Sequence, residues 1–307
     1  MLPTYYNLVM SFVDKFIKKH PVKTLRINNV AGKYITGGKN NTGFLIFPGG
    51  GQDMYSSYDL IEAYENKYKV ISLSITGFSD LKTFFTFINR ILEKEKINKV
   101  IVYGLSLGGF IAQHYVKSNK EKVIKLILSH TATTKSKPVI KKVMTPGKIL
   151  YFFLPIIPVS LLRYLVKKNA GRIQAGHSNI LDLWKKYTSK SNLEKRTEFS
   201  NRFGLDFLNR EYLNSFYRIG VNMEREEKIW DKNILMDWSK NILIIKANDD
   251  PLAQDNGMFK RYYPEAKEYI FHGTGHLTPF IQFEKMKQVI DNFISNETIP
   301  QSLPASK

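Results

Sequence analysis

The 307-residue chain contains no cysteine. This absence excludes disulfide bonds, a thiol nucleophile and cysteine metal sites, although it assigns no cellular compartment. Histidine is also scarce, with six residues. None of them forms an HExxH motif or another close spacing typical of metal ligands. We therefore expect no metal site.

Acidic residues are few beside basic ones, with 27 Asp and Glu against 46 Lys and Arg, which gives a formal net charge of +19. Such an excess raises nucleic acids and anionic membranes as partners. However, the sequence has no basic run interleaved with aromatic residues, no zinc-finger spacing and no basic-zipper heptad. We therefore expect lysines scattered over a solvated surface and no nucleic-acid partner.

Long uninterrupted apolar runs are missing as well. The most apolar stretch, Ile149–Val166, contains Pro155, Pro158 and Arg163. It is shorter than the roughly 20 apolar residues that a membrane-spanning helix needs. Basic residues flank this stretch: Lys148, Lys167 and Lys168. The pattern favours a pair of helices over an apolar pocket, and contact with a lipid surface is the alternative.

The N-terminal stretch Leu2–His20 lacks the early basic segment and small-residue cleavage site of a signal peptide. Its apolar residues recur at helical spacing: Tyr5, Leu8, Val9, Phe12, Val13, Phe16 and Ile17. Lysines toward its end and the following Pro21 indicate where the helix stops. We expect an amphipathic helix within residues 1–22, packed on the body or lying on a membrane surface. The expected location is the cytoplasm, with or without membrane association.

Apolar runs alternate with helical patterns over much of the chain. Strands are predicted at Thr24–Asn28 and Lys33–Thr36 around a turn at Gly32, and at Gly43–Phe47, Tyr68–Ser74, Lys99–Tyr103, Val123–Ser129, Asn241–Lys246 and Ala266–Phe271. Helices are predicted at about Ser56–Glu65, Leu81–Lys96, Phe110–Lys117, Gly257–Tyr263 and Pro279–Ile294. Strands that are apolar throughout, with helices between them, indicate a parallel sheet covered on both faces.

The alternation stops near His130 and resumes near Asp237. The residues between them read as helical, basic and aromatic. We therefore predict an α/β core formed by residues 23–130 and 239–296, interrupted by a helical cap at 131–238. The final residues, 297–307, are expected to form a frayed tail.

The segment Gly104-Leu105-Ser106-Leu107-Gly108 fits the pattern G-x-S-x-G. An apolar strand precedes it and an amphipathic helix follows, so the turn between them must be tight and must have small flanking residues. Ser106 is then placed at the tip of the turn and at a helix N-terminus, where negative charge is favoured. We predict Ser106 as a catalytic nucleophile.

A serine nucleophile also needs backbone donors for an oxyanion. The N–H of Leu107, directly after Ser106, is one candidate. The second should come from the loop after an earlier strand, where Pro48-Gly49-Gly50-Gly51 stands. Glycines let the backbone approach a substrate closely, and we favour Gly50, then Gly51. No Gly-Lys-Ser/Thr follows these glycines, so a phosphate-binding loop is disfavoured.

A base and an acid are predicted from the loops after the last two strands. His276 lies in a small-residue loop before the final helix, and His272 is its rival. The acid is Asp250, with Asp249 the alternative that would brace the loop. The remaining candidates, which either line the pocket or pack in the core, are His114 and His130.

The order Ser106, Asp250, His276, each after its own strand, resembles the α/β-hydrolase superfamily. The resemblance covers about residues 24–130 and 239–296, with the insertion in the cap position. It implies an eight-stranded, mostly parallel sheet, a Ser-His-acid triad and no cofactor. Two departures are Pro48, where the family often has His, and the loop Ser74–Ser79, which lacks the family's Asp.

These features predict an acyl-enzyme hydrolase for a carboxylic ester or thioester. The apolar, aromatic cap suggests a hydrophobic acyl or alkyl group. An acyltransferase, a perhydrolase and an aminopeptidase use the same parts. A binding or adaptor protein that keeps the fold without turnover is the alternative from another class. The sequence leaves the oligomeric state open.

Overall fold

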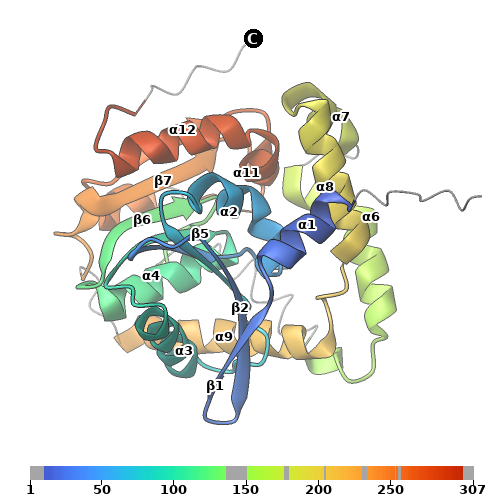
Figure 1. The fold of residues 1–307 in the computed structure, drawn as a ribbon, viewed down its shortest axis with the longest axis horizontal. Coiled ribbons are helices and arrows are strands. Elements are labelled where there is room, and N and C mark those ends of the chain that lie inside the picture. Colours follow the sequence, from blue (N-terminus) through green and yellow to red (C-terminus); the bar gives the residue numbers. More distant parts are fainter. Residues whose placement is uncertain are drawn as a thin grey trace, which may run out of the picture.

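The computed structural model describes residues 10–135, 151–175, 180–203, 205–229, 234–252, 254 and 257–299. Its eight strands form one sheet in the order β1-β2-β4-β3-β5-β6-β7-β8 (Figure 1). The pairs β1–β2 and β2–β4 are antiparallel, whereas all the other neighbours are parallel. The predicted eight-stranded, mostly parallel sheet is therefore confirmed. The strands are β1 (Lys23–Ile27), β2 (Val30–Gly37), β3 (Thr42–Phe47), β4 (Lys69–Leu73), β5 (Lys99–Leu105), β6 (Val123–Ser129), β7 (Ile242–Ala247) and β8 (Lys267–Phe271).

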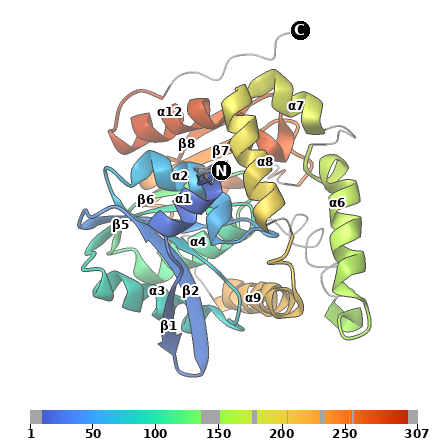
Figure 2. The ribbon, with the colours of Figure 1, turned by 45° about the vertical axis from the view of Figure 1, so that its right-hand side comes forward.

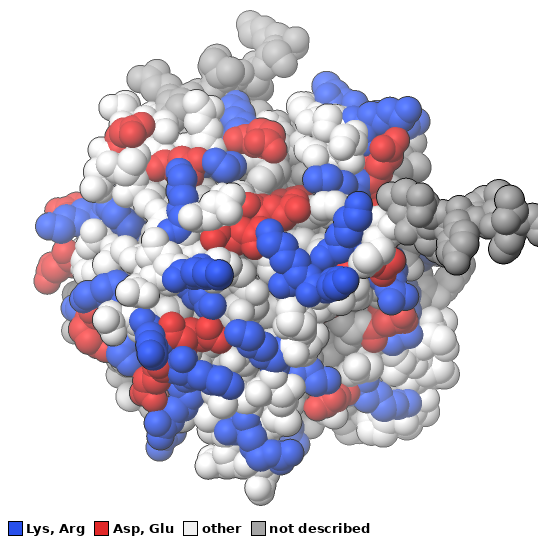
Figure 3. All heavy atoms as spheres, viewed as in Figure 1, with Lys and Arg blue, Asp and Glu red and all other residues white. Residues whose placement is uncertain are grey.

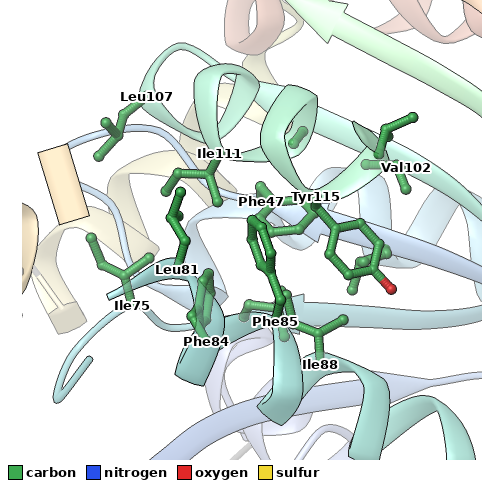
Figure 4. Packing of buried hydrophobic residues seen from close by; sticks show 14 of the residues in the cluster. Phe47, Ile75, Leu81, Phe84, Phe85, Ile88, Val102, Leu107, Ile111 and Tyr115 are labelled. Carbon is green, nitrogen blue, oxygen red and sulfur yellow. The ribbon is translucent and has the colours of Figure 1, made fainter. Parts of the chain in front are cut away.

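Side chains of the central strands alternate between two hydrophobic cores, one on each face of the sheet. In β3, Leu45 and Phe47 enter the first core, and Phe44 and Ile46 enter the second. The first core lies under α3 (Leu81–Lys94), α4 (Leu107–Asn119) and α10 (Met258–Tyr262). The second lies under α1 (Phe12–Lys19), α2 (Tyr58–Tyr64) and α12 (Phe283–Ile294). Figure 4 shows the first core, where Phe47 and Tyr115 lie beside the rings of α3.

The expected turn at Gly32 is wrong. The chain reverses between β1 and β2 at Asn28, whose φ is +51°, and Gly32 lies inside β2 opposite Leu25. A Cβ at Gly32 would lie 2.5 Å from Phe87 Cε2 and 2.6 Å from Phe78 Cζ. The glycine is therefore needed for the close approach of two aromatic rings.

The predicted N-terminal helix is described from its middle onward, because residues 1–9 lie outside the described part of the chain. The α1 helix begins at Phe12, where the Ser11 side chain accepts from the Asp14 N–H. Its buried residues are Val13 and Phe16. The Phe16 ring lies 5.5 Å from the ring of Phe199, so this part of the helix packs on the body of the protein.

Between β6 and β7 most of the described residues are helical. The helices are α6 (Val159–Ala175), α7 (Ile180–Tyr187), α8 (Lys190–Phe203) and α9 (Arg210–Ile229). In Figure 2, α6 lies along the right-hand edge of the molecule, and α9 lies on its lower side. None of the described helices is long and apolar enough to cross a membrane.

The end of the chain departs from the single predicted helix Pro279–Ile294. A short α11 (Thr278–Ile281) is separated from α12 by Gln282, whose φ and ψ of −118° and 38° are not helical. Before it, Gly275–Leu277 form one 3₁₀ turn. The predicted tail lies outside the described residues from position 300 onward.

Basic and acidic side chains are intermixed on the face that Figure 3 shows. Several basic residues of the described chain are paired: Lys23 and Lys69 both bind Glu95, at 2.7 Å and 2.9 Å. Lys19 and His20 likewise bind Glu65, at 2.5 Å and 2.8 Å. Part of the basic charge is therefore paired with carboxylates.

Candidate active site

Ser106 lies at the turn between β5 and α4 with a φ of +51° and a ψ of −116°. Such a backbone conformation costs on the order of 1–3 kcal/mol for a residue with a side chain and persists only where neighbouring contacts enforce it. Here the Ser106 N–H donates to Ser129 O at 3.0 Å. The Ser106 carbonyl accepts from the Gly109 N–H at 2.9 Å and from Thr131 Oγ1 at 2.8 Å. Three hydrogen bonds therefore hold the strained turn.

The glycines around Ser106 are each required by a close contact. A Cβ at Gly104 would lie 2.7 Å from Gly108 O, and one at Gly108 would lie 2.0 Å from Phe47 O. A Cβ at Gly109 would lie 2.6 Å from Thr131 Cγ2. The strand, the helix and the neighbouring loop therefore approach more closely than any side chain would allow, which presents Ser106 at the tip.

His276 and Asp250 form a buried hydrogen bond, with His276 Nδ1 2.8 Å from Asp250 Oδ2. Asp250 is fully buried, and its Oδ1 accepts from the Leu252 N–H at 2.8 Å. Burial by itself raises the pKa of Asp250, but the hydrogen bond and positive charge of His276 outweigh it and hold that pKa below its usual value. The carboxylate is thus kept ionised beside the imidazole.

The alternative acid, Asp249, and the alternative base, His272, are not part of the hydrogen bond between His276 and Asp250. Asp249 accepts from the Gly273 N–H and the Gly275 N–H, both at 3.1 Å, and so braces the loop that carries His276. His272 directly follows β8 and lies outside the cavity that Ser106 and His276 share. The structure therefore pairs His276 with Asp250 and leaves Asp249 a supporting position.

The glycine loop after β3 lies beside Ser106, because β3 and β5 are neighbours and Phe47 is opposite Gly104. In open α/β sheets, ligands bind at the carboxyl ends of the strands, where the connections from two neighbouring strands run to opposite faces of the sheet. Strand β3 lies in the middle of this sheet, between β4 and β5. Leu107 is the first residue of α4, so its N–H has no partner within the helix. This places Leu107 where the predicted oxyanion donor is needed.

Gly50 and Gly51 differ in how their N–H groups can be used. The Gly51 N–H donates to the hydroxyl of Tyr212 at 2.6 Å, and Gly51 has a φ of +77°. The Gly49 N–H donates to Gln52 Oε1 at 3.0 Å. Because both neighbours are engaged, the structure favours Gly50 over Gly51 as the second oxyanion donor.

Sequence reasoning did not find Tyr212, which lies on α9, 161 residues from Gly51. The residue is buried, and burial raises its pKa to about 12. Two further side chains of α9 accept from sheet loops: Ser215 Oγ from the Gly77 N–H at 2.9 Å and Asn222 Oδ1 from the Leu81 N–H at 2.8 Å. The α9 helix therefore fixes the loops after β3 and β4.

Of the two other candidate histidines, His130 lines the cavity and His114 does not. His130 is fully buried, and its ring centroid lies 6.1 Å from that of His276 at an interplanar angle of 88°. Burial lowers the pKa of His130 to about 3, so its imidazole is neutral near pH 7. His114 instead lies 3.5 Å from Glu227.

Ser106, His276, Gly50 and Leu107 open onto one cavity of about 1020 Å³. Its apolar lining comes mostly from the helical insertion: Tyr151, Leu154, Leu162, Val166, Phe207 and Phe216. A serine hydroxyl, an imidazole hydrogen-bonded to a carboxylate, and the backbone of Gly50 and Leu107 thus line one large, mostly apolar cavity. Such an arrangement can attack a carbonyl carbon and stabilise the oxyanion that forms.

Comparison with known proteins agrees with this geometry. The family model described as alpha/beta hydrolase fold matches residues 43–282. A search among curated protein sequences finds no match. Three solved structures that the chain is similar to share 13–14% identity with it, so they show the fold alone.

The names of these three proteins describe hydrolases in different terms. MGS-M2, an alpha/beta hydrolase enzyme from a Medee basin deep-sea metagenome library, has a TM-score of 0.68 at 14% identity, over 92% of this chain and 100% of its own. A mutant of the Vigna radiata epoxide hydrolase has a TM-score of 0.63 at 13% identity, over 91% and 99%. The serine hydrolase CCSP0084 from Cycloclasticus zankles has a TM-score of 0.63 at 14% identity, over 90% and 98%. The family match spans well over half of the chain, which therefore belongs to the alpha/beta hydrolase fold family.

Proposed function

We propose that the protein is a serine hydrolase that cleaves carboxylic esters or thioesters with a hydrophobic acyl or alkyl group. One observation carries the proposal: His276, hydrogen-bonded to the buried Asp250 at 2.8 Å, lines the same cavity as Ser106. A serine hydroxyl is a weak nucleophile at neutral pH and needs such an oriented base.

In the proposed reaction, Ser106 Oγ attacks the carbonyl carbon and passes its proton to the Nε2 atom of His276. Asp250 accepts from the Nδ1 side and stabilises the imidazolium. The N–H groups of Leu107 and Gly50 bind the oxyanion. The imidazolium then gives its proton to the leaving alcohol or thiol, and water releases the acyl group by the same steps.

The cavity supports an apolar substrate group. Its lining side chains are largely aliphatic and aromatic, and its volume of about 1020 Å³ lies at the upper end of ordinary ligand sites. Burying each additional CH₂ group is worth about 0.8 kcal/mol. We therefore expect kcat/KM to rise several-fold per added CH₂ until the cavity is filled.

Hydrolysis of p-nitrophenyl esters from acetate to palmitate tests this proposal. The expected result is a rise of kcat/KM with acyl length, and the control is Ser106→Ala, which should lose about 10⁴–10⁶-fold in turnover. A folded wild-type protein that hydrolyses none of the esters would instead favour a non-catalytic binding protein. A flat chain-length profile would contradict the apolar acyl site.

A further inference from the structure

The segment 151–168 exposes large apolar side chains to solvent. Phe152 and Ile156 are each 77% exposed. The other members of this group, which we call the outer apolar face, are 44–48% exposed: Phe153, Leu161 and Leu165. A group of exposed apolar residues of this size is uncommon on a monomeric soluble protein and marks an interaction surface.

The same segment faces the cavity with its other side. Leu162 and Val166, one helical turn apart on α6, line the cavity, as does Leu154 before them. Leu161 and Leu165, also one turn apart, belong to the outer apolar face. The segment is therefore a single layer between the cavity and the outside, and Figure 2 shows α6 along the edge of the molecule.

Two arginines fix this segment to the start of α9. Arg163 donates from Nε to Leu208 O at 3.0 Å and from Nη2 to Asp206 O at 2.8 Å. Arg210 donates to Leu154 O and to Ile157 O, the latter at 3.3 Å. These bonds hold the inner face against the cavity, so the outer apolar face stays directed away from the core.

The charged side chains within the segment 151–168 are all basic: Arg163, Lys167 and Lys168. Arg163 binds Asp206, with 3.1 Å between Nη1 and Oδ1, and Lys167 is exposed. Lys168 follows Leu161 and Leu165 on the same helical face and is exposed. Two copies of such a basic region would repel each other, whereas anionic lipid headgroups would attract it.

We propose that the outer apolar face docks on the surface of a lipid bilayer that contains anionic headgroups. The apolar side chains enter the boundary between headgroups and acyl chains, and the lysines contact the headgroups. The other segment expected at a membrane, α1, buries Val13 and Phe16 against the body and is therefore less suited. Docking by 151–168 goes beyond the proposed hydrolysis and does not depend on it.

Vesicle flotation of the full chain tests the docking. With vesicles of phosphatidylcholine and phosphatidylglycerol, the wild type should float, and with phosphatidylcholine alone it should float less. The double variant Phe152→Ser/Ile156→Ser should lose about tenfold or more in partitioning, because apolar burial drives insertion. Ile229→Ser is the matched control, since Ile229 is equally exposed at 78% but lies at the end of α9. It should float like the wild type.

Neither substituted residue lines the cavity. The double variant should therefore melt at the wild-type temperature and keep wild-type hydrolysis of a short soluble ester, which separates docking from the proposed function. Three results would overturn the docking: no flotation of the wild type with anionic vesicles, an equal loss in Ile229→Ser, or a soluble dimer that the double variant dissociates. The last result would make a second copy the occupant of this face.

Discussion

Large apolar side chains are less exposed to solvent in the sheet-bearing body than in the helical segment between β6 and β7. In the described body, the large apolar residues that reach solvent do so modestly: Met10 at 41%, Val22 at 44% and Ile124 at 39%. In the segment after β6, Phe152, Ile156 and Ile229 are exposed by 77–78%. The body thus buries most of its large apolar side chains, whereas the insertion exposes apolar side chains that can contact other molecules.

The two regions also divide the site between them. The candidate nucleophile, acid and base follow β5, β7 and β8 of the body, whose buried strands fix their positions. The insertion supplies most of the apolar cavity lining and, through Tyr212, a hydrogen bond to Gly51. If this division holds, changes in the body should affect the chemical step most, and changes in the insertion should affect substrate range and loop geometry.

The largest expected effect separates two adjacent carboxylates of the body. Asp250→Asn removes the charge beside His276 and the preferred acceptor for Nδ1–H, so kcat should fall by about 10³–10⁴-fold. Asp249→Asn keeps one oxygen acceptor for the loop N–H groups and should lower kcat by less than about tenfold. Steady-state kinetics of both variants, with melting curves as the control for folding, measure the contrast. Equal losses would contradict the assignment of Asp250.

Acid should destabilise the body through two of its buried histidines, His114 and His130. Burial lowers the pKa of both His114 and His130 to about 3. His114 faces Glu227, Lys117 and Lys135, and His130 faces Asp250 and His276. Unfolded histidine titrates near pH 6.5, so the unfolded state binds more protons below that pH.

The free energy of unfolding should therefore fall as the pH drops below about 6.5, by up to about 1.4 kcal/mol per pH unit for each histidine. The lowered pKa of Asp250 adds a further loss only as the pH falls below about 4, the usual value for that carboxyl. Denaturant unfolding at pH 7, 6 and 5 measures the slope, and His114→Gln should reduce it. An unfolding free energy that is constant from pH 7 to 5 would refute buried, neutral histidines.

The smallest expected effect concerns the Tyr212 hydroxyl of α9, which accepts a hydrogen bond from Gly51 in the glycine loop after β3. Tyr212→Phe leaves the Gly51 N–H without its acceptor, and one hydrogen bond is worth about 1 kcal/mol. We expect kcat to fall by about fivefold with little change in KM for a short ester. The matched control is Tyr262→Phe, because Tyr262 lies on α10 outside the cavity lining. A wild-type kcat in Tyr212→Phe would show that the loop holds its shape without α9.

The sequence was sufficient to predict most strands closely, since a strand buried on both faces reads as a continuous apolar run. The run Gly43–Phe47, for example, corresponds to β3 at Thr42–Phe47. Local rules also place Ser106 at the β5–α4 turn, because the tight turn demands glycines at fixed offsets. These rules depend only on neighbours along the chain.

Contacts between distant segments were beyond such rules. The bond from Gly51 to Tyr212 joins residues 161 positions apart, and nothing in the local pattern of α9 indicates it. The sequence predicts a turn at Gly32 because glycine favours turns, although this glycine is required inside β2 by the rings of Phe78 and Phe87. Which of Asp249 and Asp250 contacts His276 likewise depends on how the loop after β8 packs.

Labelling by a fluorophosphonate tests most directly the central claim that Ser106 is an activated nucleophile. The reagent reacts with serines that a neighbouring base activates. Peptide mapping by mass spectrometry should find the adduct on the peptide that contains Ser106, and none in the Ser106→Ala variant. Reaction should also be slowed strongly in His276→Ala. An unlabelled Ser106 in folded wild-type protein, or equal labelling of the Ser106→Ala variant, would contradict the account.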